Sequence, residues 1–389
     1  MYRMMTPGPT EPAESVLQAR AKRYSNPDVD LDFVEYYKHL CEEISRLLDT
    51  KNETLILGGE GILGLEAACA SLTEPGDKVL VIENGIFGEG FQDFVKMYGG
   101  EPCLFSGDRL CEIDVKQLED FLEQNHDFKY ATVVHGDTPS GVKNQVEKIC
   151  PLLKKYGILT VVDAVSTAFG DELHTDRCQI DLLCGGSQKA VSAPPGLTFV
   201  VLSEDAKKAI RERTRPIASF YANLQVFENY YTEKWFPYTM PISDIYGLGE
   251  AIRLIAEDAD MVDRHTCIAE AIRETLKKAG LELYLKSGYA NTVTAFRVPK
   301  QTSDRAILER MKQEHHVLLS GSFGELAGKV IRIGHMGQNA TAENMVLVLE
   351  TLQETLEYLN VPIHCNMKET FLGLYKMQTL RIDFNSQNV

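Results

Sequence analysis

Residues 159–163 read Leu-Thr-Val-Val-Asp, a run of apolar and β-branched side chains that ends on a carboxylate. A continuous run of this kind predicts a strand buried on both faces, because a strand with one solvated face alternates apolar and polar residues. Similar runs occur at 54–57, 78–82, 131–134, 182–183 and 197–202. Helical stretches separate these runs, so we predict an α/β fold with a mostly parallel sheet, whose ligands bind at the carboxyl ends of the strands.

The hydrophobic pattern also divides the chain into parts. A helix at 33–48 precedes the first strand, and a segment rich in aromatic residues and proline, 216–241, follows the last. Beyond it we predict one long helix at 248–279, strands at 281–285, 292–298, 317–320 and 330–333, and helices at 305–314 and 342–359. The segment from Cys365 shows no clear period. We therefore expect an N-terminal arm at 1–20, a large domain at 21–247 and a smaller α+β domain at 248–389.

Composition narrows the classes of partner. The 389 residues carry a net charge of −16, with 40 basic against 56 acidic residues. The sequence contains no basic cluster of the kind that binds nucleic acid or an anionic membrane, so small molecules are the expected partners. Residues 1–10 lack the apolar core of a secretion signal, and no stretch approaches the roughly 18 apolar residues of a membrane span. The nine cysteines show no C-x-x-C pair, so we expect reduced thiols, no metal site and a cytoplasmic protein.

A glycine-rich turn follows the first predicted strand. Residues 59–64 read Gly-Glu-Gly-Ile-Leu-Gly, and a later strand ends near Glu83. This spacing matches a dinucleotide-binding turn, which would make the chain an NAD-dependent dehydrogenase. Glu60 argues against that interpretation, because its carboxylate lies where a diphosphate would bind. A different phosphate at the helix N-terminus is the favoured interpretation.

Two later residues indicate which phosphate compound that is. Asp163 ends a buried strand, and Lys189 lies among small residues and turns after the next one. A desolvated lysine amine can attack an aldehyde, and a buried carboxylate can keep a pyridine nitrogen protonated, so the pair fits pyridoxal 5′-phosphate. Arg332 lies within an apolar strand, where a bare guanidinium is costly unless a carboxylate ligand or a structural acid binds it.

On these residues and the motifs around them, the chain resembles the fold-type I, class V pyridoxal-phosphate aminotransferases, closest to the alanine:glyoxylate and serine:pyruvate branch. The resemblance covers about residues 5 to 360. Its motifs are Thr-Pro-Gly-Pro-Thr at 6–10, Asn-Gly-Ile-Phe-Gly at 84–88, His-Gly-Asp-Thr-Pro-Ser-Gly at 135–141, Val-Asp-Ala-Val-Ser at 162–166, Gly-Ser-Gln-Lys-Ala at 186–190 with Pro-Pro-Gly at 194–196, and Arg-Ile-Gly at 332–334 with Gly-Gln-Asn-Ala at 337–340.

The resemblance implies a set of site residues. Lys189 would form the Schiff base with the cofactor, and Asp163 would pair with the ring nitrogen. The implied cofactor-binding residues are Gly59, Glu60, Gly61, Ile62, Phe87, Thr138, Asp163, Val165, Gln188, Lys189, Tyr238 and Thr239, and the implied substrate-binding residues are Gly8, Thr138 and Arg332. Thr239 would reach the phosphate of a neighbouring subunit, which implies a homodimer with shared active sites.

The chain departs from the family pattern at the phosphate. Glu60 replaces a small hydroxyl residue, and Phe236 stands where a tyrosine is expected, although Tyr238 is close enough to substitute. Two like charges about 4 Å apart repel by roughly 4 kcal/mol at an effective dielectric of 20. We expect Glu60 to turn away while the phosphate binds backbone N–H groups of residues 61–62, Gln188 and Thr239. On that hypothesis Glu60→Ser would not change cofactor binding.

The resemblance implies a ping-pong aminotransferase that acts on a small amino acid such as alanine, serine or glycine and on a 2-oxo acid such as glyoxylate or pyruvate. No second arginine motif suits a distal acid. A cysteine desulfurase would need a nucleophilic cysteine before Arg332, and none lies between Cys267 and Cys365. A lyase of the same fold, an aminophosphonate transaminase, a non-catalytic cofactor-binding regulator and the dehydrogenase remain as alternatives.

Overall fold

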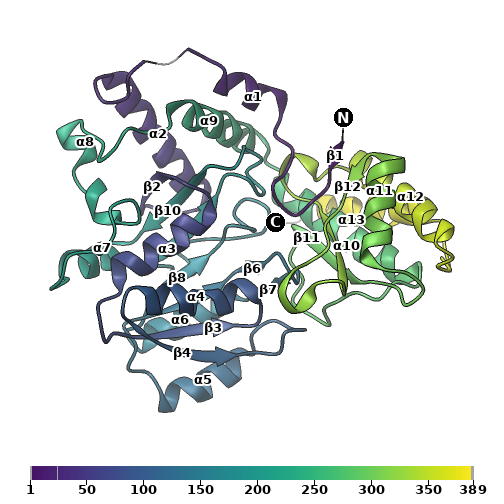
Figure 1. The fold of residues 1–389 in the computed structure, drawn as a ribbon, viewed down its shortest axis with the longest axis horizontal. Coiled ribbons are helices and arrows are strands. Elements are labelled where there is room, and N and C mark those ends of the chain that lie inside the picture. The colour runs from purple at the N-terminus through teal and green to yellow at the C-terminus, as the bar shows by residue number, and fades with distance from the viewer. Residues whose placement is uncertain (1, 24, 387–389) are drawn as a thin grey trace.

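A seven-stranded sheet forms the centre of the larger part of the molecule (Figure 1). The computed structural model describes residues 2–23 and 25–386, with the side chains of 382–386 excepted. In spatial order the strands are β2 (Glu53–Gly58), β10 (Leu197–Leu202), β9 (Leu182–Gly186), β8 (Leu159–Asp163), β5 (Tyr130–Val134), β3 (Lys78–Glu83) and β4 (Glu101–Ser106). β10 runs antiparallel to both neighbours and the other pairings are parallel, so the predicted mostly parallel sheet is confirmed.

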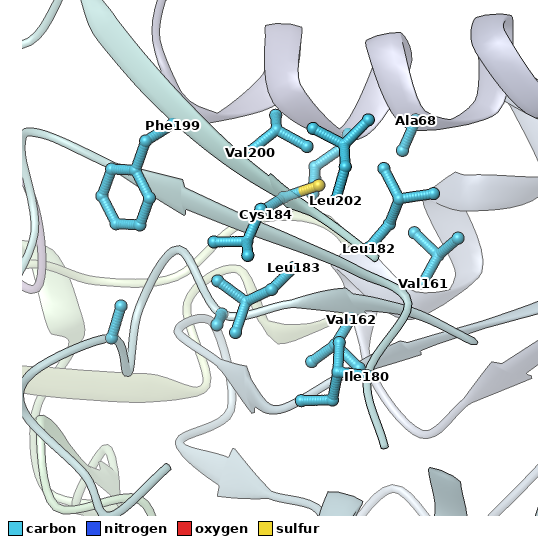
Figure 2. Close-up of a cluster of buried hydrophobic side chains, with 14 of the residues drawn as sticks. Ala68, Val161, Val162, Ile180, Leu182, Leu183, Cys184, Phe199, Val200 and Leu202 are labelled. Atoms are coloured by element: carbon cyan, nitrogen blue, oxygen red, sulfur yellow. The ribbon is translucent and has the colours of Figure 1, made fainter. Parts of the chain in front are cut away.

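The extent of burial explains which strands could be predicted from the sequence. Every residue of β5, β9 and β10 is buried, and their side chains alternate between the two faces of the sheet. Figure 2 shows this packing, with Leu182 and Val200 directed toward Ala68 of the helix above and Leu183 and Val162 toward the opposite side. β4 was not predicted, because it is an edge strand that pairs only with β3 and keeps several polar, exposed positions.

Helices surround the sheet. The helices of this part are α1 (Glu14–Arg20), α2 (Leu31–Leu47), α3 (Gly61–Leu72), α4 (Ile86–Met97), α5 (Val115–Gln124), α6 (Val146–Lys155), α7 (Glu204–Arg211), α8 (Tyr230–Glu233) and α9 (Ile242–Glu257). The same part also contains the short 3-10 helix η1 (Leu224–Phe227) and a hairpin of β6 (Gly136–Asp137) and β7 (Val142–Lys143). α3 packs on β9 and β10, and α4 packs on β3, β4 and β5. No described helix combines the length and the apolar character needed to cross a lipid bilayer.

The C-terminal part forms a second group of helices around short strands (Figure 1). Its elements are α10 (Met261–Lys278), β11 (Val293–Arg297), α11 (Asp304–His315), β12 (Val317–Leu318), η2 (Gly324–Leu326), β13 (Val330–Gly334), η3 (Gly337–Asn339), α12 (Ala342–Tyr358) and α13 (Met367–Ser386). β11 pairs with β13, and α13 packs on α10 and α12. A second cluster of buried apolar side chains lies here.

Two predictions for this part were wrong, and one segment without a prediction proved helical. The helix expected at 248–279 is two helices, because Asp258 leaves helical geometry after α9 and its carboxylate accepts hydrogen bonds from Arg264. The strand expected at 281–285 makes only one isolated bridge, between Leu283 and Phe296. The segment left unassigned beyond Cys365 contains α13, which buries apolar residues on one face but also exposes Leu372, Met377 and Leu380, so its apolar residues are not confined to that face.

The N-terminal arm contacts both parts of the molecule. β1 (Arg3–Met4) pairs in parallel with β12, and Met5 is buried in the second apolar cluster. The Gly334 N–H donates to the Met5 carbonyl at 2.8 Å, and the Thr10 N–H donates to the Gln188 carbonyl at 3.0 Å. The arm thereby carries residues 5–10 between β13 and the end of β9.

The contact between Gly185 of β9 and Phe199 of β10 gives a stability prediction. These residues are register partners, and a Cβ atom on Gly185 would overlap the Phe199 ring. Gly185→Ala should lower the free energy of unfolding by about 1–3 kcal/mol, because the core must overpack. Gly90→Ala in α4 is the control, since nothing lies within 4 Å of its added Cβ and helix propensity favours alanine. Denaturant unfolding measures the free energy of unfolding of both variants. A Gly185→Ala variant as stable as the wild type would contradict the prediction.

Candidate active site

A cavity of about 230 Å³ lies where the parallel strands end. It is lined by Glu60, Gly61, Ile62, Leu65, Phe87, Gly136, Thr138, Asp163, Val165, Ser166, Gln188 and Lys189. β2 leads to Glu60, β3 to Phe87, β5 to Thr138, β8 to Asp163 and β9 to Lys189, and the carboxyl ends of these strands meet at one edge of the sheet. Most predicted cofactor-binding residues are therefore brought together. Leu65, Gly136 and Ser166 line the same cavity and were not predicted.

Lys189 is the candidate nucleophile. Its Nζ donates to the Pro7 carbonyl at 2.9 Å, so the N-terminal arm closes over the lysine. Burial, with a smaller contribution from the charge of Arg332, lowers the pKa of Lys189 to about 8. A substantial fraction of the amine is therefore unprotonated at mildly alkaline pH. Gly8 lies against the same side chain, since a Cβ on Gly8 would overlap Lys189 Nζ.

Asp163 is the candidate partner for a ring nitrogen. It is 4% exposed, and its Oδ1 accepts a hydrogen bond from the Val165 N–H at 2.9 Å. Burial raises its pKa to about 7, while the Val165 N–H and the charge of Lys189 oppose that shift. A cation bound beside Asp163 would therefore be favoured, because it would restore the carboxylate's charge in a place that lacks water.

Arg332 supplies a buried positive charge next to the cavity. It is 8% exposed in β13, its Nε donates to the Gly321 carbonyl at 2.7 Å, and its Nη1 donates to the Thr138 carbonyl at 3.2 Å. No carboxylate in the described part of the chain forms an ion pair with it, so the structural salt bridge considered above is not found there. Burial lowers the pKa of Arg332 to about 10. The guanidinium retains donors for a carboxylate ligand.

Asp137 is a site residue that the sequence analysis missed. Its Oδ1 accepts from the Phe87 N–H at 3.1 Å, and its Oδ2 accepts from the Ser140 hydroxyl at 2.7 Å. Burial raises the pKa of this carboxyl, and the hydrogen bonds from Ser140 and Phe87, with a smaller contribution from the charge of Arg332, oppose the shift. Asp137 thus fixes the start of α4, which presents the Phe87 ring to the cavity. A carboxylate just after a buried strand was the available signal for it.

Glu60 does not turn away from the cavity, so that expectation was wrong. As the N-cap of α3, its Oε1 accepts a hydrogen bond from the Ile62 N–H at 3.2 Å. Its Oε2 accepts from Gln188 Nε2 at 2.8 Å. The physical reason is that a carboxylate satisfies unpaired N–H groups and complements the positive end of the helix dipole.

The remaining predicted residues lie outside the cavity lining. The Gly59 N–H donates to the Gly196 carbonyl at 2.8 Å, and Glu83 forms an ion pair with Arg109 rather than facing the cavity. The Tyr238 ring stacks on Tyr221, with 4.5 Å between ring centroids, and the Thr239 hydroxyl donates to Asp28 at 3.3 Å. The cofactor-binding roles of Gly59, Tyr238 and Thr239, including the approach of Thr239 to a neighbouring subunit's phosphate, stay predictions.

The lowered pKa of Lys189 gives a test by chemical labelling. Reductive methylation needs an unprotonated amine, so labelling of Lys189 should reach half its maximum near pH 8, against the ordinary lysine value of 10.5. Peptide mapping by mass spectrometry measures this, with the exposed Lys208 as internal reference. Arg332→Gln should move the Lys189 midpoint to higher pH. A midpoint for Lys189 at the ordinary value would contradict the assignment.

Comparison with known proteins identifies the family. The sequence model described as aminotransferase class-V matches residues 8–343. The chain is 32% identical over 355 residues to pyridoxamine–pyruvate transaminase of Mesorhizobium japonicum, covering 90% of each chain, and 32% identical over 337 residues to alanine–glyoxylate aminotransferase of Callithrix jacchus, covering 84% of this chain and 80% of that one.

Solved structures agree with the sequence relatives. The crystal structure of ureidoglycine–glyoxylate aminotransferase from Bacillus subtilis superposes with a TM-score of 0.93 at 28% identity, covering 97% of this chain and 98% of that one. The fold class, the family and the cofactor predicted from the sequence are thereby confirmed, and the dehydrogenase interpretation of the glycine-rich turn is set aside. The chain belongs to the class V aminotransferases, which are enzymes that depend on pyridoxal 5′-phosphate.

Proposed function

We propose that this enzyme transfers an amino group between a small amino acid (alanine, serine or glycine) and a 2-oxo acid such as glyoxylate or pyruvate. The observation that carries the proposal is the buried Arg332 guanidinium, which has no carboxylate partner among the described residues and donates to Thr138 at the cavity wall. An α-carboxylate would satisfy it through charge-assisted hydrogen bonds. The names of the relatives, which include alanine, pyruvate and glyoxylate, support this substrate class.

The ring end of the cavity suits the family cofactor. Pyridoxal phosphate supplies an aldehyde that carries the amino group and a pyridine ring that withdraws electrons from the substrate. Asp163 would hold the proton on the ring nitrogen, and Phe87 would stack on the ring face. The Lys189 amine would anchor the aldehyde carbon and then carry a proton to and from the substrate Cα. The phosphate end fits less well, because Glu60 already binds the donors there.

The cavity favours a small side chain on the amino acid. Among the described residues that line it, Lys189 is the only cation, so a second carboxylate on the substrate would find no partner there. Arg332 would fix the α-carboxylate, and this orientation would place the Cα–H bond close to the Lys189 amine. Alanine, serine and glycine meet these requirements.

We also propose that the enzyme is a cytoplasmic homodimer in which Thr239 approaches the partner's site. The side chains of Phe220, Tyr221 and Trp235, which lie in the same segment as Thr239, are each more than half exposed, and a subunit interface would cover them. All nine cysteines lie in the described part of the chain and form no disulfide there, in keeping with a reducing compartment. The domains 21–247 and 248–389 would supply Lys189 and Arg332 respectively, with 1–20 as the arm.

The proposed role of Lys189 predicts a spectroscopic result. Wild-type protein that is loaded with pyridoxal 5′-phosphate and then freed of unbound cofactor should show a visible absorbance band that borohydride bleaches. Lys189→Ala should lack this band and lose about 10²–10⁴-fold in transamination rate, because no amine remains to bond the aldehyde or carry the proton. Lys208→Ala, at an exposed position, should behave as wild type. A bleachable band of normal intensity in Lys189→Ala would refute the assignment.

The proposed role of Arg332 predicts a kinetic result. Arg332→Gln should lower kcat/KM for alanine and for glyoxylate by about 10–100-fold, mostly through KM, since a hydrogen bond to a charged group contributes about 1.5–3 kcal/mol. Arg305→Gln in α11, with a side chain 82% exposed, is the matched control. A panel of amino acids and 2-oxo acids measures both variants. An unchanged KM in Arg332→Gln would remove the basis of the proposal.

A further inference from the structure

The carboxylate of Glu60 occupies the place expected for a phosphate. Four donors were expected for the phosphate: the N–H groups of residues 61 and 62, Gln188 and Thr239. Of these, the Ile62 N–H and the Gln188 amide both donate to the Glu60 carboxylate, one to each oxygen. Glu60 and Gln188 are 128 positions apart in the chain, so their contact is a property of the folded site. The first turn of α3 is thus already partnered by an anion that belongs to the protein.

No positive side chain of the described residues neutralises Glu60 by direct contact so that a second anion could bind beside it. Within the described part of the chain, no lysine or arginine forms an ion pair with it. Glu60 is exposed to solvent on one side, yet a phosphate group and a carboxylate at adjoining hydrogen-bonding positions about 4 Å apart still repel each other by roughly 4 kcal/mol at an effective dielectric of 20. Binding a phosphate here therefore requires Glu60 to give up both hydrogen bonds and to move.

A neutral hydroxyl group, unlike a phosphate, can form favourable hydrogen bonds with the same atoms. An O–H can donate to a Glu60 oxygen, which accepts more than one hydrogen bond. The Gln188 Oε1 atom is buried and lacks a hydrogen-bond partner in the structure, so it offers a second acceptor beside the first. The polar end of the cavity therefore presents acceptors to a ligand, whereas a phosphate needs donors.

We propose that this site also binds the unphosphorylated forms of the cofactor, pyridoxal and pyridoxamine, as substrates, and binds them more tightly than their 5′-phosphates. Glu60 would accept the hydrogen bond of the hydroxymethyl group that replaces the phosphate ester. The ring would keep the contacts assigned above to Asp163 and Phe87, so the inference rests on the proposed function.

The resulting reaction needs no reagent beyond the two substrates. The amino group leaves the exocyclic carbon of pyridoxamine, which is oxidised to an aldehyde, and bonds the carbonyl carbon of the 2-oxo acid, which is reduced to an amine. The carbonyl oxygen leaves as water, and a second water supplies the aldehyde oxygen. Lys189 would carry the proton from one carbon to the other, while Arg332 holds the acid's carboxylate. The products, pyridoxal and an amino acid, dissociate.

Binding can be measured apart from catalysis. Pyridoxine and pyridoxine 5′-phosphate carry an alcohol in place of the aldehyde or amine, so neither can bond to Lys189 or react. Titration calorimetry on the wild-type protein should show pyridoxine binding about tenfold or more tightly than its phosphate. Glu60→Gln and Glu60→Ser should reverse or abolish this preference. Serine is a strong N-cap, so the second variant keeps α3 capped without the charge.

Glu123→Gln in α5 is the matched control, since it removes an exposed acid that does not line the cavity. It should retain the wild-type preference. In parallel, pyridoxamine and pyridoxamine 5′-phosphate are assayed with pyruvate, and the wild type should convert pyridoxamine with the higher kcat/KM. Tighter binding of the phosphate by the wild type, or a preference that both Glu60 variants leave unchanged, would overturn the inference.

The same assays separate this inference from the proposed function. A protein that transaminates alanine and glyoxylate with bound pyridoxal 5′-phosphate, and that ignores pyridoxamine, would retain the proposed function and refute the inference. A protein that transfers an amino group from pyridoxamine to pyruvate, and that does not use alanine with glyoxylate through bound pyridoxal 5′-phosphate, would support the inference and refute the amino-acid donors proposed above.

Discussion

Three ionisable side chains are held around one cavity without neutralising each other by direct contact. Asp163, Lys189 and Arg332 are largely removed from water, and no ion pair between any two of them is found among the described residues. Such an arrangement costs free energy, because each charge loses its hydration without gaining a close partner. Rigid elements offset the cost, since ladder hydrogen bonds of β8 and β13 fix the backbones of Asp163 and Arg332, and Lys189 lies in the turn that directly follows β9. A cofactor with a cationic ring nitrogen and an aldehyde, together with the carboxylate of a substrate, would supply all three missing partners.

The helix N-terminus next to this cavity has a partner of its own. In many phosphate-binding folds the first turn of a helix is left open for the ligand, and its N–H groups provide the attraction. Here Glu60 caps α3 and also engages Gln188. The two ends of the cavity therefore differ in chemistry: the charged groups at the ring end lack close ionic partners, whereas two donors at the other end, the Ile62 N–H and the Gln188 amide, are already bound by Glu60. That difference bears on which form of the cofactor the site accepts.

The success of the strand predictions follows from burial. β5, β8 and β10 lie inside the sheet, so their sequences are almost wholly apolar and stand out at 131–134, 159–163 and 197–202. Edge strand β4 was missed because several of its positions are exposed to solvent, which breaks the apolar run. Helix α13 was missed because its apolar residues include exposed as well as buried ones, which removes the helical period. The break between α9 and α10 escaped notice because apolar residues continue at helical spacing on both sides of Asp258.

The sequence by itself determined which chemical groups are available: a lysine, an aspartate and an arginine in apolar surroundings, and an acid in a glycine-rich turn. These follow from local pattern, because burial and turn geometry act over a few residues. Only the tertiary structure decided that Glu60 bonds Gln188, that Arg332 reaches Thr138, and that Asp137 fixes Phe87. The reason is that each contact joins residues far apart in the chain, and their distance depends on the strand order and on how the arm and β13 pack against the sheet.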